Sequence, residues 1–447
     1  MTRKTIRLVQ QVVVSVILLG QAVLYAQTAS PPPVVKLRFS IDLPPKSQQV
    51  VFSPVSKLLA VQWQHGPVQI IDTADGKETA LIPFVDDSIF GIQWTKDGRC
   101  LLIATSKSTA IWDARDGKRL TTPIKVPRTK YFKMFGRLEL SPDEKLLLSV
   151  TQDEGILSTA FDRDKAIARV WNLETGQLKY EIKIRGRYAS AAFSANGKQI
   201  LATDEEHLPR LYDVETGRLF AKLEPPHRAI FSESNRAEFS PDGRFVIHMH
   251  ESGIYIWHSS SAAISARIAY DENSTASSME GFTPDGKMFV TSQQTRSSKF
   301  RTSITLRDCE TGEVKATFAA EKWDDWPSRL WFGNDGQTLV VTSGYKYKAR
   351  TWDVRTGSFK ATIPLILKYS RIPLDLDPRD HDVLSVHPTQ PIISAAGNKF
   401  VRLLDADTGE LLQTLENNTW PAEWSSDGKT FVTFTEGLRT AQVWEVR

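Results

Sequence analysis

The sequence predicts an all-β protein in which one four-stranded unit is repeated about nine times. Two repeating patterns support this prediction. Segments related to FSPDGRF recur every 38 to 54 residues, and most units end in a turn related to Asp-x-x-Thr-Gly, as in LYDVETGR. A period of this length is typical of folds in which each repeat is one supersecondary unit. The nine copies of the first pattern begin at Phe52, Trp94, Leu140, Phe193, Phe239, Phe282, Phe332, Val386 and Trp424.

Each unit is predicted to form two β-hairpins. The runs between the turns, such as LLIAT and LLLSV, are rich in Val, Ile, Leu and Thr and show no helical period. Asp-Gly, Asn-Gly and Thr-Gly pairs suit short turns that need a positive φ. The order within a unit is therefore strand, hairpin, strand, variable loop, strand, hairpin, strand.

The composition is that of an ordinary globular protein, with 41% hydrophobic and 24% charged residues. The formal charge of +4 depends on Arg3, Lys4 and Arg7, and the rest of the chain carries about +1. We therefore expect no nucleic-acid partner. Cys100 and Cys309 are the only cysteines, and we expect both to pack as small apolar groups in a fold held together by its core.

The N-terminus has the layout of a secretory signal peptide, with a basic start, an apolar run from Val12 and a small residue at Ala26. We predict a signal peptide over residues 1–26 and a Pro-rich linker over 27–34. The mature chain is expected to be secreted or periplasmic, without stable membrane insertion. The alternative is an uncleaved membrane anchor, although the run contains Gln21 and is shorter than the roughly 20 residues that span a bilayer.

The SPDG turn is followed some way along each unit by a strand that ends in Trp-Asp in two cases, Trp112-Asp113 and Trp352-Asp353. In these features residues 35–447 resemble the WD-repeat β-propeller family. The resemblance implies a single closed β-propeller of about nine four-stranded blades, with seven or eight blades as the alternative. The Gly-His pair of the family is missing from all nine units, so the buried hydrogen-bond tetrad of that family is not implied.

The Asp-x-x-Thr-Gly turns also resemble those of quinoprotein dehydrogenases. The Trp that follows the Gly in that family is absent, so we expect no quinone and no other cofactor.

The two chain ends are predicted to complete one blade together. The last unit stops after its third strand at Val443–Val446, and Val35–Phe39 resembles the fourth strand that Val314–Phe318 forms in another unit. A strand from the N-terminus would close the ring and protect its edges.

His248 and His250 lie two positions apart in a predicted strand and should point to one face, which raises the question of a metal site. Sister units place other polar residues there. We predict a structural role for both histidines, because two ligands lack the third and fourth that a metal site needs. The slot of His250 is filled elsewhere by Thr105, Thr151, Asp204, Gln293, Ser343 and Thr435, and that of His248 by Ser149, Thr291, Ser394 and Thr433.

The variable loops carry the candidate ligand-binding residues, since function in repeat scaffolds concentrates on loops. Exposed aromatics among charges are typical of recognition surfaces, although the two Trp side chains could instead cap a blade core. Four aspartates in PLDLDPRDHD suggest a calcium site. The alternative is a solvated acidic loop, because the segment lacks the glycine and the glutamate of the EF-hand pattern. The candidates are Trp323, Asp324, Asp325, Trp326, Tyr345, Tyr347, Asp375, Asp377, Asp380 and Asp382.

We find no nucleophile elbow, haem-binding, phosphate-binding or zinc-protease motif in the sequence. The prediction is therefore a non-catalytic extracytoplasmic interaction scaffold that binds protein or peptide on the variable-loop face. One alternative is a metal-dependent lactonase or other hydrolase at the propeller mouth. Another is a carbohydrate-binding propeller in which Trp323 or Trp326 stacks on a sugar ring.

Overall fold

A computed structural model describes residues 34–447 of the chain, apart from internal gaps. Residues 1–33 lie outside the described part. The gaps are 44–46, 56, 64–65, 84–88, 106, 126–137, 154–164, 186–189, 205–207, 227–236, 251, 271–273, 296–301, 319–326, 334–335, 344–347, 365–383, 398 and 436–438.

The described residues form nine antiparallel sheets, which confirms the all-β prediction and the count of nine blades. Blade 1 contains β2 (Ser47–Phe52), β3 (Leu58–Trp63), β4 (Val68–Asp72) and β5 (Glu78–Ile82). Blade 2 contains β6 (Ile89–Trp94), β7 (Cys100–Thr105) and β8 (Thr109–Asp113). Blade 3 contains β9 (Leu138–Leu140), β10 (Leu146–Asp153), β11 (Lys165–Asn172) and β12 (Leu178–Arg185). Blade 4 contains β13 (Ser190–Phe193), β14 (Gln199–Thr203), β15 (Pro209–Asp213) and β16 (Leu219–Lys222).

The remaining five blades continue around the ring. Blade 5 contains β17 (Ala237–Phe239), β18 (Phe245–His250), β19 (Gly253–His258) and β20 (Ile264–Ile268). Blade 6 contains β21 (Ser274–Phe282), β22 (Met288–Thr295), β23 (Thr302–Asp308) and β24 (Val314–Phe318). Blade 7 contains β25 (Pro327–Phe332), β26 (Thr338–Ser343), β27 (Lys348–Asp353) and β28 (Phe359–Pro364). Blade 8 contains β29 (Leu384–Val386), β30 (Ile392–Ala396), β31 (Phe400–Asp405) and β32 (Leu411–Glu416). Blade 9 contains β33 (Thr419–Trp424), β34 (Thr430–Phe434), β35 (Thr440–Val446) and β1 (Val35–Asp42).

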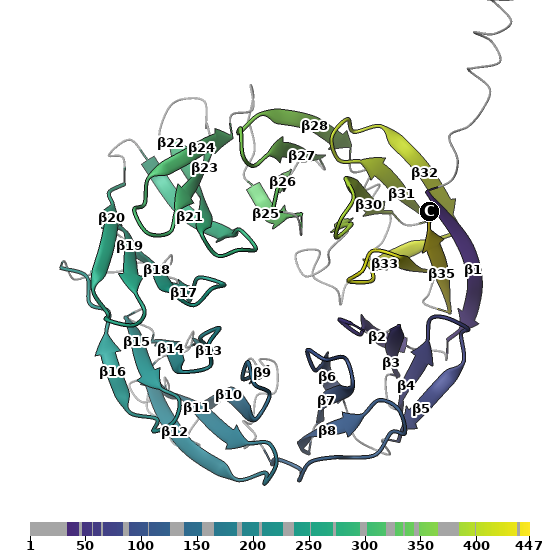
Figure 1. Ribbon diagram of the computed structural model, residues 1–447, viewed down its shortest axis with the longest axis horizontal. Helices are drawn as coiled ribbons and strands as arrows, with labels where there is room; N and C mark the ends of the chain where they lie inside the picture. The colour runs from purple at the N-terminus through teal and green to yellow at the C-terminus, as the bar shows by residue number, and fades with distance from the viewer. Residues whose placement is uncertain are drawn as a thin grey trace, which may run out of the picture.

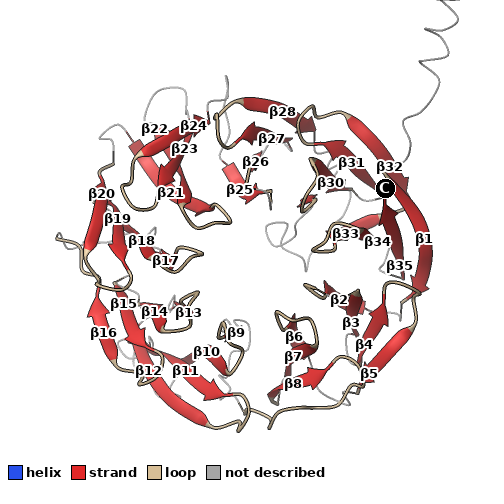
Figure 2. Ribbon diagram, in the orientation of Figure 1, coloured by secondary structure: helices blue, strands red, loops and turns tan. Residues whose placement is uncertain are grey.

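The blades stand around a common centre, with the first strand of each blade innermost and the fourth outermost (Figure 1). Within the described part of the chain every regular element is a strand (Figure 2). No described helix is long and apolar enough to cross a membrane.

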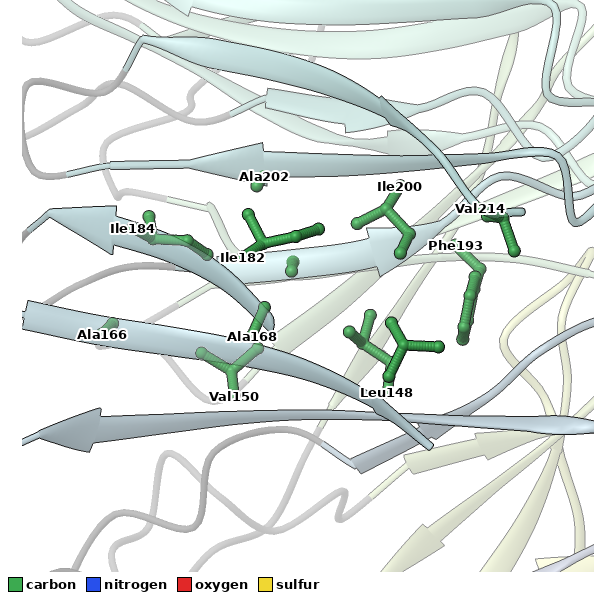
Figure 3. Packing of buried hydrophobic residues seen from close by; sticks show 12 residues of the cluster. Leu148, Val150, Ala166, Ala168, Ile182, Ile184, Phe193, Ile200, Ala202 and Val214 are labelled. Carbon is green, nitrogen blue, oxygen red and sulfur yellow. The ribbon is translucent and has the colours of Figure 1, made fainter. Parts of the chain in front are cut away.

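The core lies between the blades. Along each strand alternate side chains point to opposite faces of the sheet, so both faces of a blade can pack against its neighbours. Figure 3 shows the junction of blades 3 and 4, where Leu148 and Val150 face Phe193 and Ile200, and all four are buried. The described residues form nine such apolar clusters, one at each junction of neighbouring blades. The apolar core therefore runs around the whole ring.

Blade 9 closes the ring as the sequence predicts. β1 pairs with β35 from Val35 opposite Val446 to Asp42 opposite Thr440, with one bulge near Leu37. The side chain of Gln413 in blade 8 bonds both the N–H and the carbonyl of Val35, at 2.9 and 3.0 Å. The two chain ends are thereby fixed to each other and to the preceding blade.

Blade 2 departs from the predicted four strands. Its outer position is held by residues 119–124, which make only isolated bridges to β8. The Thr121 hydroxyl, in place of a backbone carbonyl, accepts from the N–H of Ile111 at 3.0 Å. The N–H of Ile124 donates to the carbonyl of Thr109 and that of Leu120 to the carbonyl of Ile111, so the pairing slips between these two contacts and the described residues form no regular fourth strand here.

Candidate functional site

Each blade presents two kinds of connection on opposite faces of the ring. Consecutive strands are antiparallel, so the hairpins that join strands one to two and three to four lie on one face. We call this the hairpin face. The loops that join strands two to three, and one blade to the next, lie on the other, which we call the variable-loop face.

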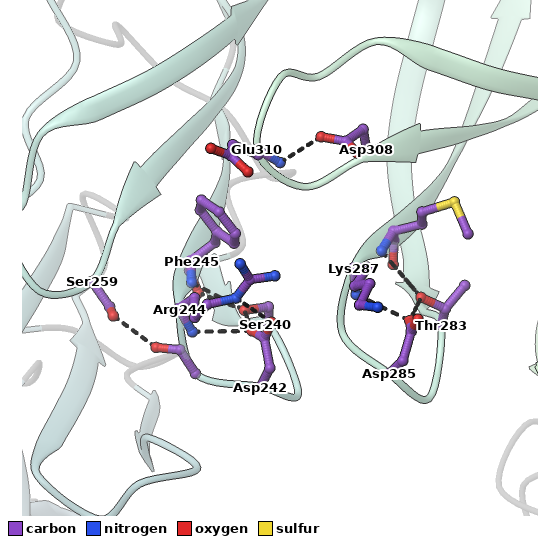
Figure 4. A network of polar contacts seen from close by, with 12 residues as sticks. Ser240, Asp242, Arg244, Phe245, Ser259, Thr283, Asp285, Lys287, Asp308 and Glu310 are labelled. Atoms are coloured by element: carbon purple, nitrogen blue, oxygen red, sulfur yellow. Dashed lines mark hydrogen bonds and ion pairs between the residues drawn. The ribbon is translucent and has the colours of Figure 1, made fainter.

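The inner hairpins of blades 2 to 6 and of blade 9 share one set of side-chain hydrogen bonds, shown for blades 5 and 6 in Figure 4. In blade 5 the Ser240 hydroxyl donates to Asp242 at 2.6 Å and accepts from the N–H of Phe245 at 3.0 Å. Asp242 also accepts from the N–H of Arg244, and Gly243 takes a φ of +72°. Gly supplies this backbone conformation without strain.

The same bonds favour the ionised form of the aspartate in the turn. In blade 6 the Thr283 hydroxyl donates to Asp285 at 2.7 Å, and the N–H of Lys287 donates to the same oxygen at 3.1 Å. The bond from Thr283 is the main reason that the pKa of Asp285 lies below its ordinary value. The aspartates of the SPDG turns are therefore ionised caps of the backbone.

The outer hairpins use aspartate in the same way. Asp308 accepts from the N–H groups of Glu310 and Thr311, both at 2.9 Å, and from the Thr311 hydroxyl at 3.2 Å. Asp353, the acidic residue of one Trp-Asp pair, accepts from the N–H and the hydroxyl of Thr356 at 2.8 Å. These aspartates accept hydrogen bonds from their own turns, so they offer few further acceptors to a ligand on the hairpin face.

His248 and His250 lie on β18 of blade 5 and are both buried, at 0% and 3% exposure. Their rings meet edge to face, 5.7 Å apart. The Nδ1 atom of His250 accepts from the N–H of Ser252 at 3.2 Å and lies 2.7 Å from the Ser252 hydroxyl. That hydroxyl lies 2.9 Å from the hydroxyl of Tyr255. The ring of His250 thus ties the loop after β18 to the next strand.

The residues in the His250 slot of other blades have a similar task. Thr105 in blade 2 accepts from the N–H groups of Lys107 and Ser108, both at 3.1 Å. Asp204 in blade 4 accepts from the N–H of Leu208 at 2.9 Å. In each case the side chain at the end of strand two fastens the variable loop that follows.

The residues in the His248 slot meet a tryptophan in two blades. The Trp171 indole N–H donates to Ser149 at 3.0 Å, and that of Trp444 donates to Thr433 at 2.8 Å. Within the described residues no group of three or more His, Cys, Asp or Glu side chains is arranged to hold a metal ion.

Charged side chains lie in the middle of blade 3 and at the variable-loop ends of blades 4 and 5, which are consecutive in the ring (Figure 1). In blade 3, Arg169 is 8% exposed; it donates to Glu181 at 2.6 Å and also bonds the Thr151 hydroxyl. In blade 4, Arg210 pairs with the buried carboxylate of Asp204.

Blade 5 adds a third charged group at the same ends of its strands. Arg267 donates to the carbonyl of Ser252 at 3.1 Å, and its guanidinium lies 5.6 Å from the centre of the Tyr255 ring. Tyr255 itself is fully buried. The exposed arginine is therefore held over an aromatic ring that joins it to the His250 network.

The structure does not place the candidate residues that the sequence suggests for this face. All ten lie outside the described residues: Trp323, Asp324, Asp325, Trp326, Tyr345, Tyr347, Asp375, Asp377, Asp380 and Asp382.

The charged groups of blades 3 to 5 are absent from the sequence prediction. Arg169 and Arg210 lie inside apolar strands, and a charged residue in such a run is the signal that could have found them. Their partners are Glu181 on β12 and Asp204 directly after the end of β14. Only the register of the sheet shows that they meet.

The comparisons with known proteins concern the fold first. No family model matches the chain. Among solved structures, a crystal structure of the eukaryotic initiation factor superposes with a TM-score of 0.61 at 15% identity, over 90% of this chain and 93% of that one. At this identity the likeness shows the shared fold alone.

Two curated proteins are similar in sequence. Eukaryotic translation initiation factor 3 subunit I of Lodderomyces elongisporus is 23% identical over 254 residues, which make up 52% of this chain and 66% of that protein. Target of rapamycin complex subunit wat1 of Schizosaccharomyces pombe is 32% identical over 116 residues, or 24% of this chain and 32% of that one. The chain thus matches about two thirds of the first relative and one third of the second.

Proposed function

We propose that this chain, a β-propeller of the WD-repeat type, is a non-catalytic interaction scaffold that binds a protein or peptide on its variable-loop face. The observation that carries the proposal is the contrast between the faces. Most turns of the hairpin face repeat the same aspartate caps, whereas the charged groups of the variable-loop face differ from blade to blade. A surface that varies over a constant frame is suited to recognition of one partner.

The chemistry of blades 4 and 5 supports a polar partner. Arg210 and Arg267 lie at the variable-loop ends of two consecutive blades, where Arg210 pairs with Asp204 and Arg267 donates to the carbonyl of Ser252. Arginine fixed in this way loses little side-chain entropy on binding and is enriched in protein interfaces. We infer a partner that presents carboxylates or backbone carbonyls to this face.

The names of the two relatives also favour protein partners. One is called a subunit of an initiation factor and the other a subunit of a complex. We propose only the general property for this chain, which is assembly with other proteins through a propeller.

We further propose that the chain acts outside the cytoplasm. The support is the N-terminal sequence, with Arg3, Lys4 and Arg7 before an apolar run that ends at Ala26. Mass spectrometry of the native protein should find a mature N-terminus near Gln27 in a secreted or periplasmic fraction. An intact Met1 in a soluble cytoplasmic fraction would exclude export.

The binding proposal is tested by capture followed by measured affinity. The mature chain is used to capture partners from the compartment in which it is found, and the binding constant of the captured protein is measured by calorimetry. Trp323→Ala with Trp326→Ala should weaken binding at least about tenfold, as truncated aromatic hot spots do.

The matched control is Arg355→Ala, in the outer hairpin of blade 7, which should leave the affinity within about twofold. If the control weakens binding and the tryptophan variant does not, the partner binds the hairpin face and the proposal is wrong. Arg267→Ala, in blade 5, tests how far the interface extends around the ring.

A further inference from the structure

One inner hairpin is built around a histidine. In most blades the turn begins with a hydroxyl residue, whereas blade 8 has His387 there, in the sequence HPTQP. The hydroxyl residues are Ser53, Thr95, Ser141, Ser194, Ser240, Thr283 and Ser425. Unlike a hydroxyl, an imidazole changes its charge near neutral pH.

The His387 ring is 2% exposed and holds the turn through Nδ1. This atom accepts from the N–H of Thr389 at 3.1 Å and from the N–H of Gln390 at 2.9 Å. Because Nδ1 acts as an acceptor, the single proton of the neutral ring is on Nε2. That atom lies 2.9 Å from the carbonyl oxygen of Gly428, to which it donates.

Gly428 belongs to the inner hairpin of blade 9, the blade that both chain ends complete. The His387 ring also meets Trp424 of blade 9 edge to face, with 4.7 Å between ring centres. Trp424 in turn stacks on Phe431 at 4.1 Å. The neutral ring of His387 thus joins the turn of blade 8 to the core of the closing blade.

We propose that His387 is an acid-sensitive joint between blade 8 and the closing blade. A proton added at Nδ1 would point an N–H at the two backbone N–H groups that the atom now accepts from. Both bonds of the turn would be lost, while the bond from Nε2 to Gly428 would remain. The ring cannot keep both sets of bonds in its charged form, so acid would loosen the turn of blade 8.

The surrounding charges do not cancel this effect. Burial is the largest influence and lowers the pKa of His387, while the bond to Gly428 and the charge of Asp427 raise it by less. Asp427 belongs to the blade 9 hairpin and is itself influenced by Lys429 and by Lys57 of blade 1. The folded chain therefore favours the neutral ring more than the unfolded chain does.

The pH window follows from the direction of this shift. Because the pKa of His387 in the folded chain lies below the ordinary 6.5, the stabilisation of the fold by the neutral ring is fully present above pH 6.5. It is lost as the pH falls from 6.5 through the folded pKa, because the unfolded chain binds the proton first. The effect should be at most about one proton taken up on unfolding, since a single ring titrates.

The test compares the unfolding of the full chain with that of His387→Asn between pH 8 and pH 5. Asparagine can offer its amide oxygen to Thr389 and Gln390 and does not titrate. The denaturant midpoint of the wild type should fall over this range by more than that of the variant. The fluorescence of Trp424, isolated as the difference between wild type and Trp424→Phe, should change over the same range before global unfolding.

His248→Thr with His250→Thr is the control, because it removes two buried histidines far from the closing blade. This variant should keep the acid response of the wild type. The proposal would be overturned if the denaturant midpoint fell equally with pH in the wild type and in His387→Asn. It would also be overturned if the acid response disappeared in the blade 5 control instead. If His387→Asn fails to fold, a graft of the sister turn, His387→Ser with Thr389→Asp and Gln390→Gly, provides the same comparison.

Discussion

The hairpin end and the variable-loop end of a blade differ in how closely their sequences repeat from blade to blade. At the hairpin end, Gly217 and Gly312 take φ values of +69° and +71°, and Asp213 and Asp308 cap both turns with the same oxygen atom. At the variable-loop end, no shared residue type performs the common task of fastening the loop. The comparison teaches that sequence repeats where the backbone must adopt one unusual conformation and varies where several side chains can make the same bond.

The largest expected effect tests the hairpin end, with Gly217→Ala. An added Cβ would lie 2.6 Å from the ring of Tyr180 in the preceding blade, at a φ of +69°. The ring cannot easily move, because the Tyr180 hydroxyl donates to the carbonyl of Val214 at 2.6 Å. We expect a loss of about 3 kcal/mol in the free energy of unfolding, measured by denaturant titration.

The matched control is Gly91→Ala in β6. Apart from Gly91 itself and its two neighbours in the chain, no described residue has an atom within 4 Å of the position that the Cβ would take. The unfolding free energy should stay the same or rise by up to about 1 kcal/mol, since alanine reduces the entropy of the unfolded chain. A similar loss of unfolding free energy in both variants would mean that the positive φ and close packing of Gly217 do not set the cost of the substitution.

The second prediction concerns acid, which should act through the hairpin face. Eleven aspartates in the described turns have a pKa below the ordinary 3.8: Asp75, Asp97, Asp113, Asp116, Asp143, Asp213, Asp242, Asp285, Asp308, Asp353 and Asp427. Their stabilisation is complete well above pH 3.8 and is lost as the pH falls below it, because the unfolded chain takes up protons first.

The acid midpoint of unfolding should therefore lie below pH 4 and move upward when caps are removed. Asp213→Ala is the sharpest variant, since Thr216 is the main cause of its lowered pKa and contributes two bonds to it, at 2.7 and 2.8 Å. It should cost about 1 to 2 kcal/mol at pH 7 and much less at pH 3. An equal cost at both pH values would contradict a role for the ionised carboxylate.

The same contrast explains what the sequence could and could not predict. The blade count, the turns and the closing strand depend on Gly, Asp and alternating apolar residues, whose effects are local. The pair of Arg169 with Glu181 depends on the register between two strands, which no local pattern contains. The contacts of His387 with Gly428 and Trp424 are likewise not predictable from its turn sequence, because they join residues of two blades that are far apart along the chain.

Two turns offer a test of the need for glycine, since other residues occupy the same backbone conformation. Ala262 in blade 5 has a φ of +56°, and Glu144 in blade 3 has a φ of +58°. Ala262→Gly should raise the unfolding free energy by about 0.5 to 1 kcal/mol, because glycine removes the steric cost of positive φ.

Glu144→Gly should gain less, because the Glu144 carboxylate accepts from the N–H of Lys96 in the neighbouring blade. Denaturant titrations of the two variants side by side measure the difference. A larger gain for Glu144→Gly than for Ala262→Gly would show that the bond to Lys96 contributes nothing to stability.

The smallest effect is expected at the variable-loop end, from the double variant His248→Thr with His250→Thr. The Trp257 indole N–H, buried beside this pair, has no hydrogen-bond partner among the described residues. Threonine at position 248 would occupy the slot from which Thr433 accepts the indole N–H of Trp444 at 2.8 Å. A threonine at position 250 would offer the loop the same acceptor that Thr105 offers in blade 2.

These gains oppose the loss of two buried rings, so the unfolding free energy should change by about 1 kcal/mol or less in either direction. Denaturant titration gives the change, and elemental analysis of both proteins gives the metal content. Metal ligands would behave differently: the wild type would carry stoichiometric metal, a chelator would destabilise it, and the variant would lose both properties. A loss above about 3 kcal/mol without metal would instead mean that the histidines make bonds that threonine cannot replace, and that the sister blades are a poor guide to this one.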